Sequence, residues 1–78
     1  MNRFTIKLSS VKDVKDFVNM VKLFDFDIDL FSDRYVIDAK SIMGIFSVDL
    51  SQPLTLRVHS DAADDVDQFK VAIDRFLV

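Results

Sequence analysis

The chain has 78 residues, half of them hydrophobic, with no cysteine and a formal net charge of −3. This length predicts one domain over residues 1–78, and the absence of cysteine excludes disulfides, thiolate catalysis and cysteine-ligated zinc. Basic residues are dispersed, which argues against nucleic acid as a partner. No apolar run approaches the roughly 18 residues of a membrane span, and the N-terminus enters strand-like sequence without a signal peptide. We therefore expect a cytoplasmic protein with no membrane contact, no metal and no cofactor.

The first half of the chain predicts a strand, a helix and a hairpin. Phe4, Ile6 and Leu8 alternate with polar residues and predict a strand at about 2–8. Ser10-x-x-Asp13 resembles a helix capping box. Apolar residues at spacings of three and four then predict an amphipathic helix at about 11–24. Alternation predicts a second strand at about 26–30, a turn at 32–34 and a third strand that begins at residue 35 and pairs with the second as a hairpin.

The second half predicts two more helices around a fourth strand. Ser41 can cap a short helix that runs to about Leu50, and residues 54–58 alternate as a strand after Pro53. Ser60 or Asp61 can cap a last helix, and Asp61, Asp64 and Asp65 lie near its positive end. One face of that helix carries Val66, Phe69, Ile73 and Phe76. The order β-α-β-β-α-β-α, with one apolar face per element, predicts an α+β fold in which three helices cover one face of a four-stranded sheet.

Two groups of polar residues have ordinary structural interpretations. Asp25, Asp27 and Asp29 are spaced as in a calcium loop, but Leu30 and Val36 stand where that loop requires Gly and Glu. The period of two instead predicts the solvent face of a strand. Ser9 and Ser10 precede the first helix, where capping accounts for a serine, and no base is identified that would make either a nucleophile.

His59 is the only histidine in the chain. Alternation in the fourth strand places it on the face opposite Leu56 and Val58, so an exposed surface histidine is expected. No second histidine or patterned carboxylate indicates a metal site, and no nucleophile motif accompanies it as a general base would require.

The segment Ser41-Ile42-Met43-Gly44-Ile45-Phe46 is unusually apolar for a short helix. Ile42 and Phe46 are four residues apart and share a face, with Met43 beside them, while Ile45 points inward. An Ile-Met-Phe patch predicts a protein-binding surface because methionine adapts to varied partners. The alternative is that these side chains complete the core.

Lys40-Ser41-Ile42-Met43-Gly44, followed by Ile45-Phe46-Ser47, resembles the regulatory-serine segment of the HPr proteins, the histidine-containing phosphocarriers of the sugar phosphotransferase system. The resemblance is specific across about residues 40–47, and it agrees with the predicted element order. It implies an open-faced β-sandwich, phosphorylation of Ser41 by HPr kinase, and a docking surface formed by Ile42, Met43 and Phe46. An unmodified helix cap is the alternative role of Ser41.

The resemblance also implies a phosphate-carrying histidine after the first strand, in a segment like Gly-x-His-Ala-Arg-Pro. Residues 8–14 of this chain read Leu-Ser-Ser-Val-Lys-Asp-Val, with no histidine, arginine, proline or glycine. A phosphoserine ester lacks the labile P–N bond that permits onward transfer, so Ser10 would not replace the histidine.

The leading interpretation is a non-enzymatic, HPr-like binding or regulatory protein. It would use Ile42, Met43 and Phe46 to contact phosphotransferase-system proteins, HPr kinase or a transcriptional regulator. A second hypothesis is a phosphotransfer protein that uses His59, which would need to lie near the N-terminus of the first helix. A third is a structural or assembly domain of the same fold.

Overall fold

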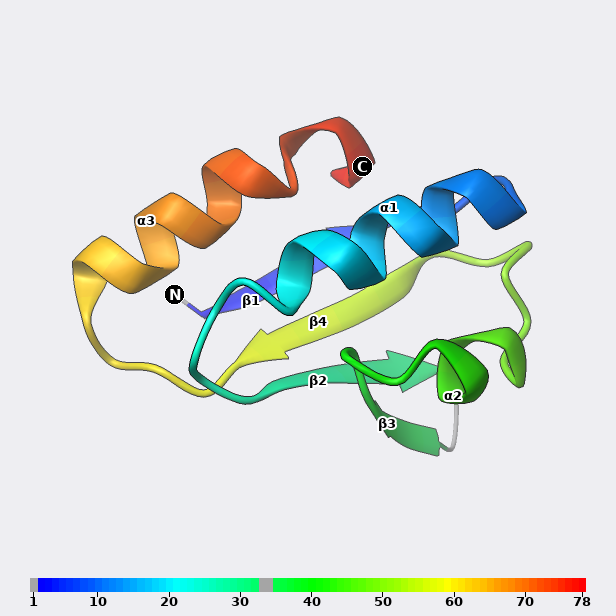
Figure 1. The fold of residues 1–78 in the computed structure, drawn as a ribbon, viewed down its shortest axis with the longest axis horizontal. Coiled ribbons are helices and arrows are strands. Elements are labelled where there is room, and N and C mark those ends of the chain that lie inside the picture. Colours follow the sequence, from blue (N-terminus) through cyan, green and yellow to red (C-terminus); the bar gives the residue numbers. More distant parts are fainter. Residues whose placement is uncertain (1, 33–34) are drawn as a thin grey trace.

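The structure is a computed structural model that describes residues 2–32 and 35–78. Four strands, three α-helices and a short 3₁₀ helix follow one another in the predicted order (Figure 1). The predicted turn at residues 32–34 falls partly outside the described residues. The elements are β1 (Arg3–Ile6), α1 (Val11–Val21), β2 (Ile28–Ser32), β3 (Tyr35–Asp38), α2 (Ile42–Phe46), β4 (Leu54–Val58), α3 (Ala63–Ala72) and η1 (Asp74–Phe76).

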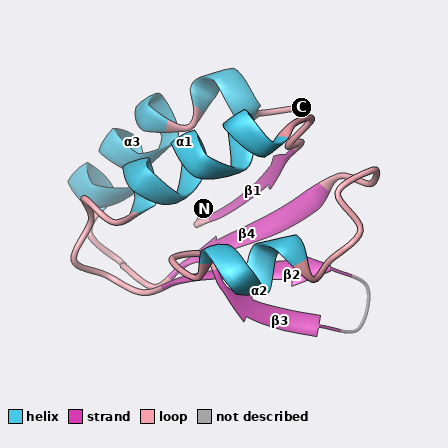
Figure 2. Ribbon diagram, turned by 45° about the vertical axis from the view of Figure 1, so that its right-hand side comes forward, coloured by secondary structure: helices cyan, strands magenta, loops and turns pink. Residues whose placement is uncertain are grey.

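The strands form one antiparallel sheet in the order β1-β4-β2-β3 (Figure 2). β2 and β3 pair as the predicted hairpin, and β4 lies between β1 and β2. Residues 76–78 run along the outer edge of β1, where Phe76 O accepts from Lys7 N at 2.9 Å and Val78 N donates to Thr5 O at 3.2 Å. The predicted α+β fold, with three helices on one face of a four-stranded sheet, is confirmed.

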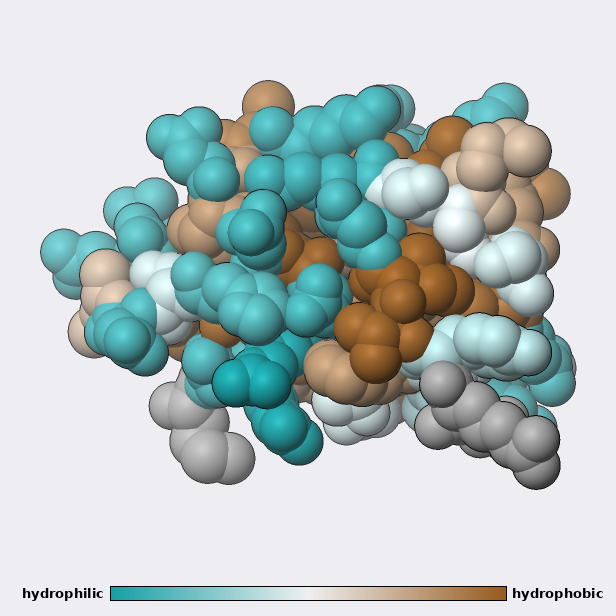
Figure 3. All heavy atoms as spheres, turned by 90° about the horizontal axis from the view of Figure 1, so that it is seen from below, coloured by the Kyte–Doolittle hydropathy of each residue, from teal (hydrophilic) through white to brown (hydrophobic). Residues whose placement is uncertain are grey.

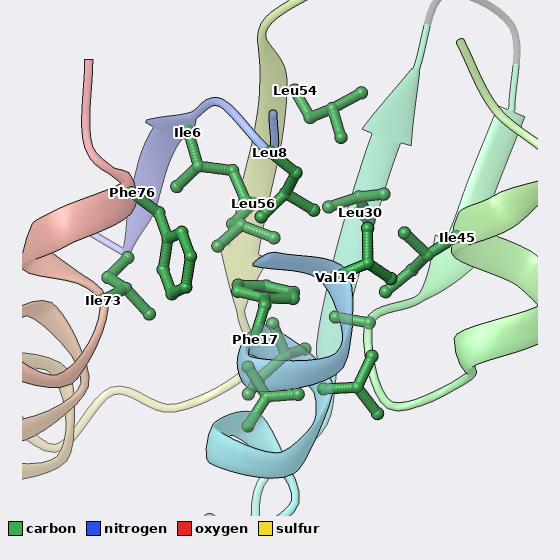
Figure 4. Packing of buried hydrophobic residues seen from close by; sticks show 14 of the residues in the cluster. Ile6, Leu8, Val14, Phe17, Leu30, Ile45, Leu54, Leu56, Ile73 and Phe76 are labelled. Carbon is green, nitrogen blue, oxygen red and sulfur yellow. The ribbon is translucent and has the colours of Figure 1, made fainter. Parts of the chain in front are cut away.

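One buried cluster joins the three helices to one face of the sheet (Figure 4). Every second residue of each strand faces the helices, and helix residues spaced three or four apart face the sheet. These side chains meet in one layer between the sheet and the helices. Phe17 packs edge-on against Phe76, with ring centroids 5.6 Å apart. The fully buried residues include Ile6, Leu8, Val14, Phe17, Leu30, Ile45, Leu54, Leu56, Phe69 and Ile73.

The predicted boundaries of the first helix and second strand are wrong by two to three residues. α1 ends at Val21 rather than Phe24, and β2 begins at Ile28 rather than Phe26. The reason is aromatic packing: Phe24 lies 5.4 Å from Phe26 and 5.3 Å from Phe69 between ring centroids. These rings fill the space between the connection and α3, so neither phenylalanine continues a regular element.

Four other predicted boundaries also differ. β1 is shorter than residues 2–8, and α2 ends at Phe46 rather than near Leu50. Neither Ser60 nor Asp61 caps α3, because its N-cap is Ala62 and no side chain caps it. The Ser60 hydroxyl instead donates to the Asp65 carboxylate at 2.9 Å. The last helix also stops at Ala72, and a separate 3₁₀ turn carries Phe76 into the core.

In the described residues, no helix combines the length and the apolar character that a membrane span requires. The second face of the sheet carries no helix. Exposed and half-buried side chains of all four strands therefore form an open surface on that side.

Candidate docking surface on α2

Ser41 holds the start of α2 in the way the sequence predicts. Its backbone is extended, with φ −99° and ψ 104°, and its hydroxyl accepts from Gly44 N at 3.2 Å. Ser41 N donates to Asp38 O at 2.9 Å, which ties the cap to the end of β3. A side-chain oxygen at this position satisfies an amide that has no partner within the helix. The half-buried Ser41 is therefore a helix cap in this structure.

Gly44 lets α2 lie close to β3. A Cβ atom at this position would lie 2.5 Å from Ile37 Cγ2 and 3.2 Å from the Ser41 hydroxyl oxygen. The first distance is below any ordinary van der Waals contact, so a larger residue would push the helix away from the strand. The close approach sets which side chains of α2 reach the core.

Four apolar residues of α2 divide between the core and the surface. Ile45 is fully buried, while Met43 is 78% exposed and Phe46 is 42% exposed. Ile42 is half-buried and packs against the core. The prediction that Ile45 points inward is confirmed; Ile42 partly completes the core, whereas Met43 and Phe46 remain exposed. Figure 3 shows a patch of hydrophobic atoms amid hydrophilic surface, in the half of the molecule that holds β3 and α2. Ile42, Met43 and Phe46 together form the α2 patch.

Two lysines fasten the chain on either side of α2. Lys40 Nζ donates to Phe24 O at 2.7 Å, and Lys7 Nζ donates to Leu50 O at 2.8 Å. Both bonds bridge segments that are distant in sequence, so nothing in the local pattern predicts them. They hold the loops that lead into and out of α2.

The segment where the resemblance places a carrier histidine is the start of α1. Ser10 is the N-cap, and its hydroxyl accepts from Asp13 N at 3.1 Å. The Asp13 carboxylate in turn accepts a hydrogen bond from Ser9 N at 3.1 Å. The predicted capping box is therefore present, with Ser9 rather than Ser10 as the donor to the carboxylate. Side-chain oxygens of the chain itself therefore accept from two backbone amides at this helix end, those of Ser9 and Asp13.

Arg75 adds a second set of charges beside the same helix end. One of its terminal nitrogens lies 3.2 Å from both Asp13 Oδ1 and Asp16 Oδ2, and Lys12 Nζ lies 3.1 Å from Asp16 Oδ2. The hydrogen bond from Lys12 and the positive charges nearby hold the pKa of Asp16 below its usual value. Sequence reasoning did not identify Arg75, because 62 residues separate it from Asp13.

His59 is exposed, as predicted, and lies just beyond β4. Its Nε2 is 2.6 Å from Asp29 Oδ2. The start of β4 pairs with the end of β1, which leads into α1, whereas His59 follows the opposite end of β4 (Figure 1). The structure therefore does not bring His59 and the N-terminus of α1 together.

The three aspartates that are spaced as in a calcium loop do not form a metal site. Asp25 and Asp27 lie in the connection before β2, and only Asp29 is on the strand. Over residues 2–32 and 35–78, no group of three or more potential ligands is placed to hold a metal ion.

Comparison with known proteins identifies structural relatives of this arrangement. HPr-C-His from Thermoanaerobacter tengcongensis superposes with a TM-score of 0.73 and 26% identity, over 94% of this chain and 90% of that one. The structural neighbours are HPr phosphocarrier proteins. HPr from Bacillus anthracis str. Ames gives a TM-score of 0.67 at 24% identity, covering 90% of this chain and 93% of that protein.

A mycoplasma histidine-containing phosphocarrier protein matches over 97% of both chains, with a TM-score of 0.70 and 16% identity. At such identities the last two likenesses concern the fold alone. No family model matches the sequence, and no curated protein matches it either. The chain therefore has the open-faced α+β sandwich of HPr, and its sequence departs widely from those relatives.

Proposed function

We propose that this chain is an HPr-like protein related to the sugar phosphotransferase system, and that it binds partner proteins without carrying phosphohistidine at the usual site. The observation that carries this proposal is the α2 patch, with Met43 and Phe46 exposed on a helix whose other side is fixed by Gly44 and Ile45. The patch occupies the segment in which the sequence resembles the docking surface of HPr.

The start of α1 supports the non-carrying part of the proposal. Residues 8–14 contain no histidine, and Asp13 and Ser10 already satisfy amides at that helix end. Arg75, the basic group beside them, is paired with two carboxylates. A phosphoryl group placed here would compete with Asp13 and Asp16 for the same positive charge, because like charges at close range are unfavourable.

The α2 patch suits a protein partner because of its chemistry and its rigidity. An exposed methionine adapts its shape to different apolar surfaces, and phenylalanine offers a large area for burial. The helix beneath them is capped at Ser41 and anchored by Ile45, so little ordering is needed on binding. A few such side chains supply most of the binding energy of many interfaces.

A substitution experiment tests the docking surface. We expect Met43→Asp and Phe46→Asp each to weaken binding to purified enzyme I, HPr kinase or an HPr-binding regulator by about tenfold or more, as for interface side chains worth roughly 2 kcal/mol. Calorimetric titration would measure the affinity. Val71→Asp is the matched control, because Val71 is also exposed and apolar but lies on α3.

Equal affinity of the wild type and both α2 variants for a partner would contradict the assignment of this surface. A loss of affinity in Val71→Asp as large as in the α2 variants would contradict it as well, because the effect would then not be specific to α2.

Phosphorylation of Ser41 by HPr kinase is the regulatory part of the proposal. A phosphate adds about −1.5 to −2 charges beside Ile42 and Met43, so it would oppose docking of an apolar partner. Its support is the resemblance around Ser41 and the position of that residue at the cap of α2.

Two incubations separate regulation from phosphate transfer. With HPr kinase and ATP, we expect acid-stable phosphate on Ser41 and none in Ser41→Ala. With enzyme I and phosphoenolpyruvate, we expect no acid-labile phosphate. Mass spectrometry and acid treatment would distinguish the products, and acid-labile phosphate on His59 would favour the phosphotransfer hypothesis instead.

A further inference from the structure

The open face of the sheet carries a row of charged residues that crosses all four strands. Cross-strand register places these residues side by side, and they alternate along their strands with core residues, so their side chains lie on the face away from the helices. In sheet order the row, here called the charged row, is Arg3, Arg57, Asp29 and Asp38.

The charged row is divided into a basic half and an acidic half. Arg3 and Arg57 are directly opposite each other on β1 and β4, which is an unfavourable arrangement for like charges. Within the described residues, neither arginine forms an ion pair with a carboxylate of the same chain. Asp29, the direct neighbour of Arg57 on β2, is bonded to His59 through Oδ2, while its Oδ1 has no side-chain partner among the described residues and can accept from a second copy. The two guanidinium groups are therefore available to carboxylates outside the chain.

The order of charges in this row is its own complement when reversed. Read from β1 to β3 the signs are plus, plus, minus, minus, and a second copy turned about a two-fold axis parallel to the strands presents minus, minus, plus, plus. In such a pair Arg3 meets Asp38 of the second copy, and Arg57 meets Asp29 of the second copy. A two-fold pair makes every contact twice, so four opposite-charge contacts form from one row.

The next row on the same face agrees with this arrangement. Its register pairs Thr5 with Thr55, Thr55 with Phe31, and Phe31 with Val36. Under the same two-fold axis, Phe31 would contact Thr55 of the second copy. Val36, which is 60% exposed, would contact Thr5 of the second copy. No charge is buried against an apolar group in this row.

We propose that the open face is a homodimer interface, in which two copies pack sheet against sheet with their strands aligned. Aligned packing of two sheets is an ordinary arrangement, with a separation of about 10 Å between them. Four strands about 4.8 Å apart, each four or five residues long at about 3.3 Å per residue, give a face of roughly 250 to 300 Å² per copy. Stable complexes bury roughly 800 Å² per partner. The dimer is therefore weak, salt-dependent and formed at high concentration.

This interface is separate from the α2 patch. α2 packs on the core side of the sheet, against β3 and Ile37, whereas the charged row lies on the other side. A dimer through the open face leaves both copies of the α2 patch accessible. The proposal therefore does not depend on the proposed function.

Charge exchange across the interface provides the test. Arg57→Asp places an aspartate against Asp29 of the second copy, and Asp29→Arg places an arginine against its Arg57, so each variant alone is expected to be monomeric. An equimolar mixture restores opposite charges at both contacts and is expected to dimerise. Lys15→Asp on α1 is the matched control, because it changes the net charge as Arg57→Asp does, on an exposed residue of the helix layer.

Sedimentation equilibrium over concentrations up to the order of 1 mM, at low salt and at about 0.5 M salt, would measure the dimer. Wild type and Lys15→Asp should dimerise at low salt and dissociate at high salt, and circular dichroism should show all variants folded. A monomeric wild type at the highest concentration, or Arg57→Asp that dimerises as well as wild type, would overturn the proposal. So would failure of the mixture to dimerise.

Discussion

At the scale of single residues, the smallest side chain in α2 has the largest structural consequence. Gly44 sits where a Cβ would meet Ile37 Cγ2 at 2.5 Å, so the helix touches β3 through its backbone. That approach carries Ile45 into the core and leaves Met43 exposed. The exposure of Met43 thus results both from the close approach of α2 to β3 and from the position of Met43 in the helix.

We predict that Gly44→Ala destabilises the protein by about 1 kcal/mol. The added methyl overpacks against Ile37, which typically costs roughly 1–3 kcal/mol, and the better helix propensity of alanine offsets up to about 1 kcal/mol of this. Urea unfolding followed by circular dichroism measures the difference.

A double-mutant cycle with Ile37→Ala isolates the cause. In the Ile37→Ala background the contacting methyl is absent, so Gly44→Ala should be neutral or stabilising there. An equal loss of stability in both backgrounds would show that the contact with Ile37 is not responsible.

At the scale of elements, α1 is fixed at its start by bonds of two kinds. Ser10 and Asp13 cap the helix locally, and Arg75 from the last turn of the chain reaches Asp13 and Asp16. The guanidinium of Arg75 also lies 4.5 Å from the centre of the Phe76 ring. The charged contacts therefore join η1 to α1 above the buried Phe17–Phe76 pair.

We predict that Asp16 makes stability depend on pH in the acid range. Its pKa is lowered from 3.8, first by the hydrogen bond from Lys12. A carboxyl with a lowered folded-state pKa stabilises the fold above its unfolded pKa, and that contribution disappears as the pH falls through the folded value. Wild type should therefore lose more stability than Asp16→Asn between about pH 6 and pH 2.

Urea midpoints across that pH range would test this prediction. Asp67→Asn on α3 serves as the control, because Asp67 forms no ion pair with any described residue. It should follow the wild-type curve. Parallel pH curves for wild type and Asp16→Asn would show that the Lys12 and Arg75 contacts do not contribute.

At the scale of the whole molecule, the two faces of the sheet differ in what covers them and in which side chains they carry. One face is covered by helices and holds the entire buried cluster, including Phe17, Phe69 and Leu56. The other presents charged and half-buried residues of all four strands to solvent. The helix layer carries the α2 patch and the open face carries the proposed dimer contact, so partner binding and self-association can occur together.

The element order and the core followed from the sequence alone, because alternation and three-to-four spacing depend only on local backbone geometry. The same holds for the caps at Ser10 and Ser41, which bond within three residues, and for the inward position of Ile45. Boundaries were less well predicted where packing decided them. Phe24 and Phe26 read as parts of a helix and a strand, but their rings pack on Phe69 from the opposite end of the chain.

Only the tertiary structure decided which charges that are distant in the sequence meet. Arg75 lies 62 residues from Asp13, and His59 lies 30 residues from Asp29. The row from Arg3 to Asp38 exists because β4 enters between β1 and β2. Local patterns place each of these residues on a face of its own element, but strand order and register determine its neighbours. For this reason the sequence by itself determined the fold and indicated the α2 patch, whereas the fold alone revealed the self-complementary order of charges on the open face.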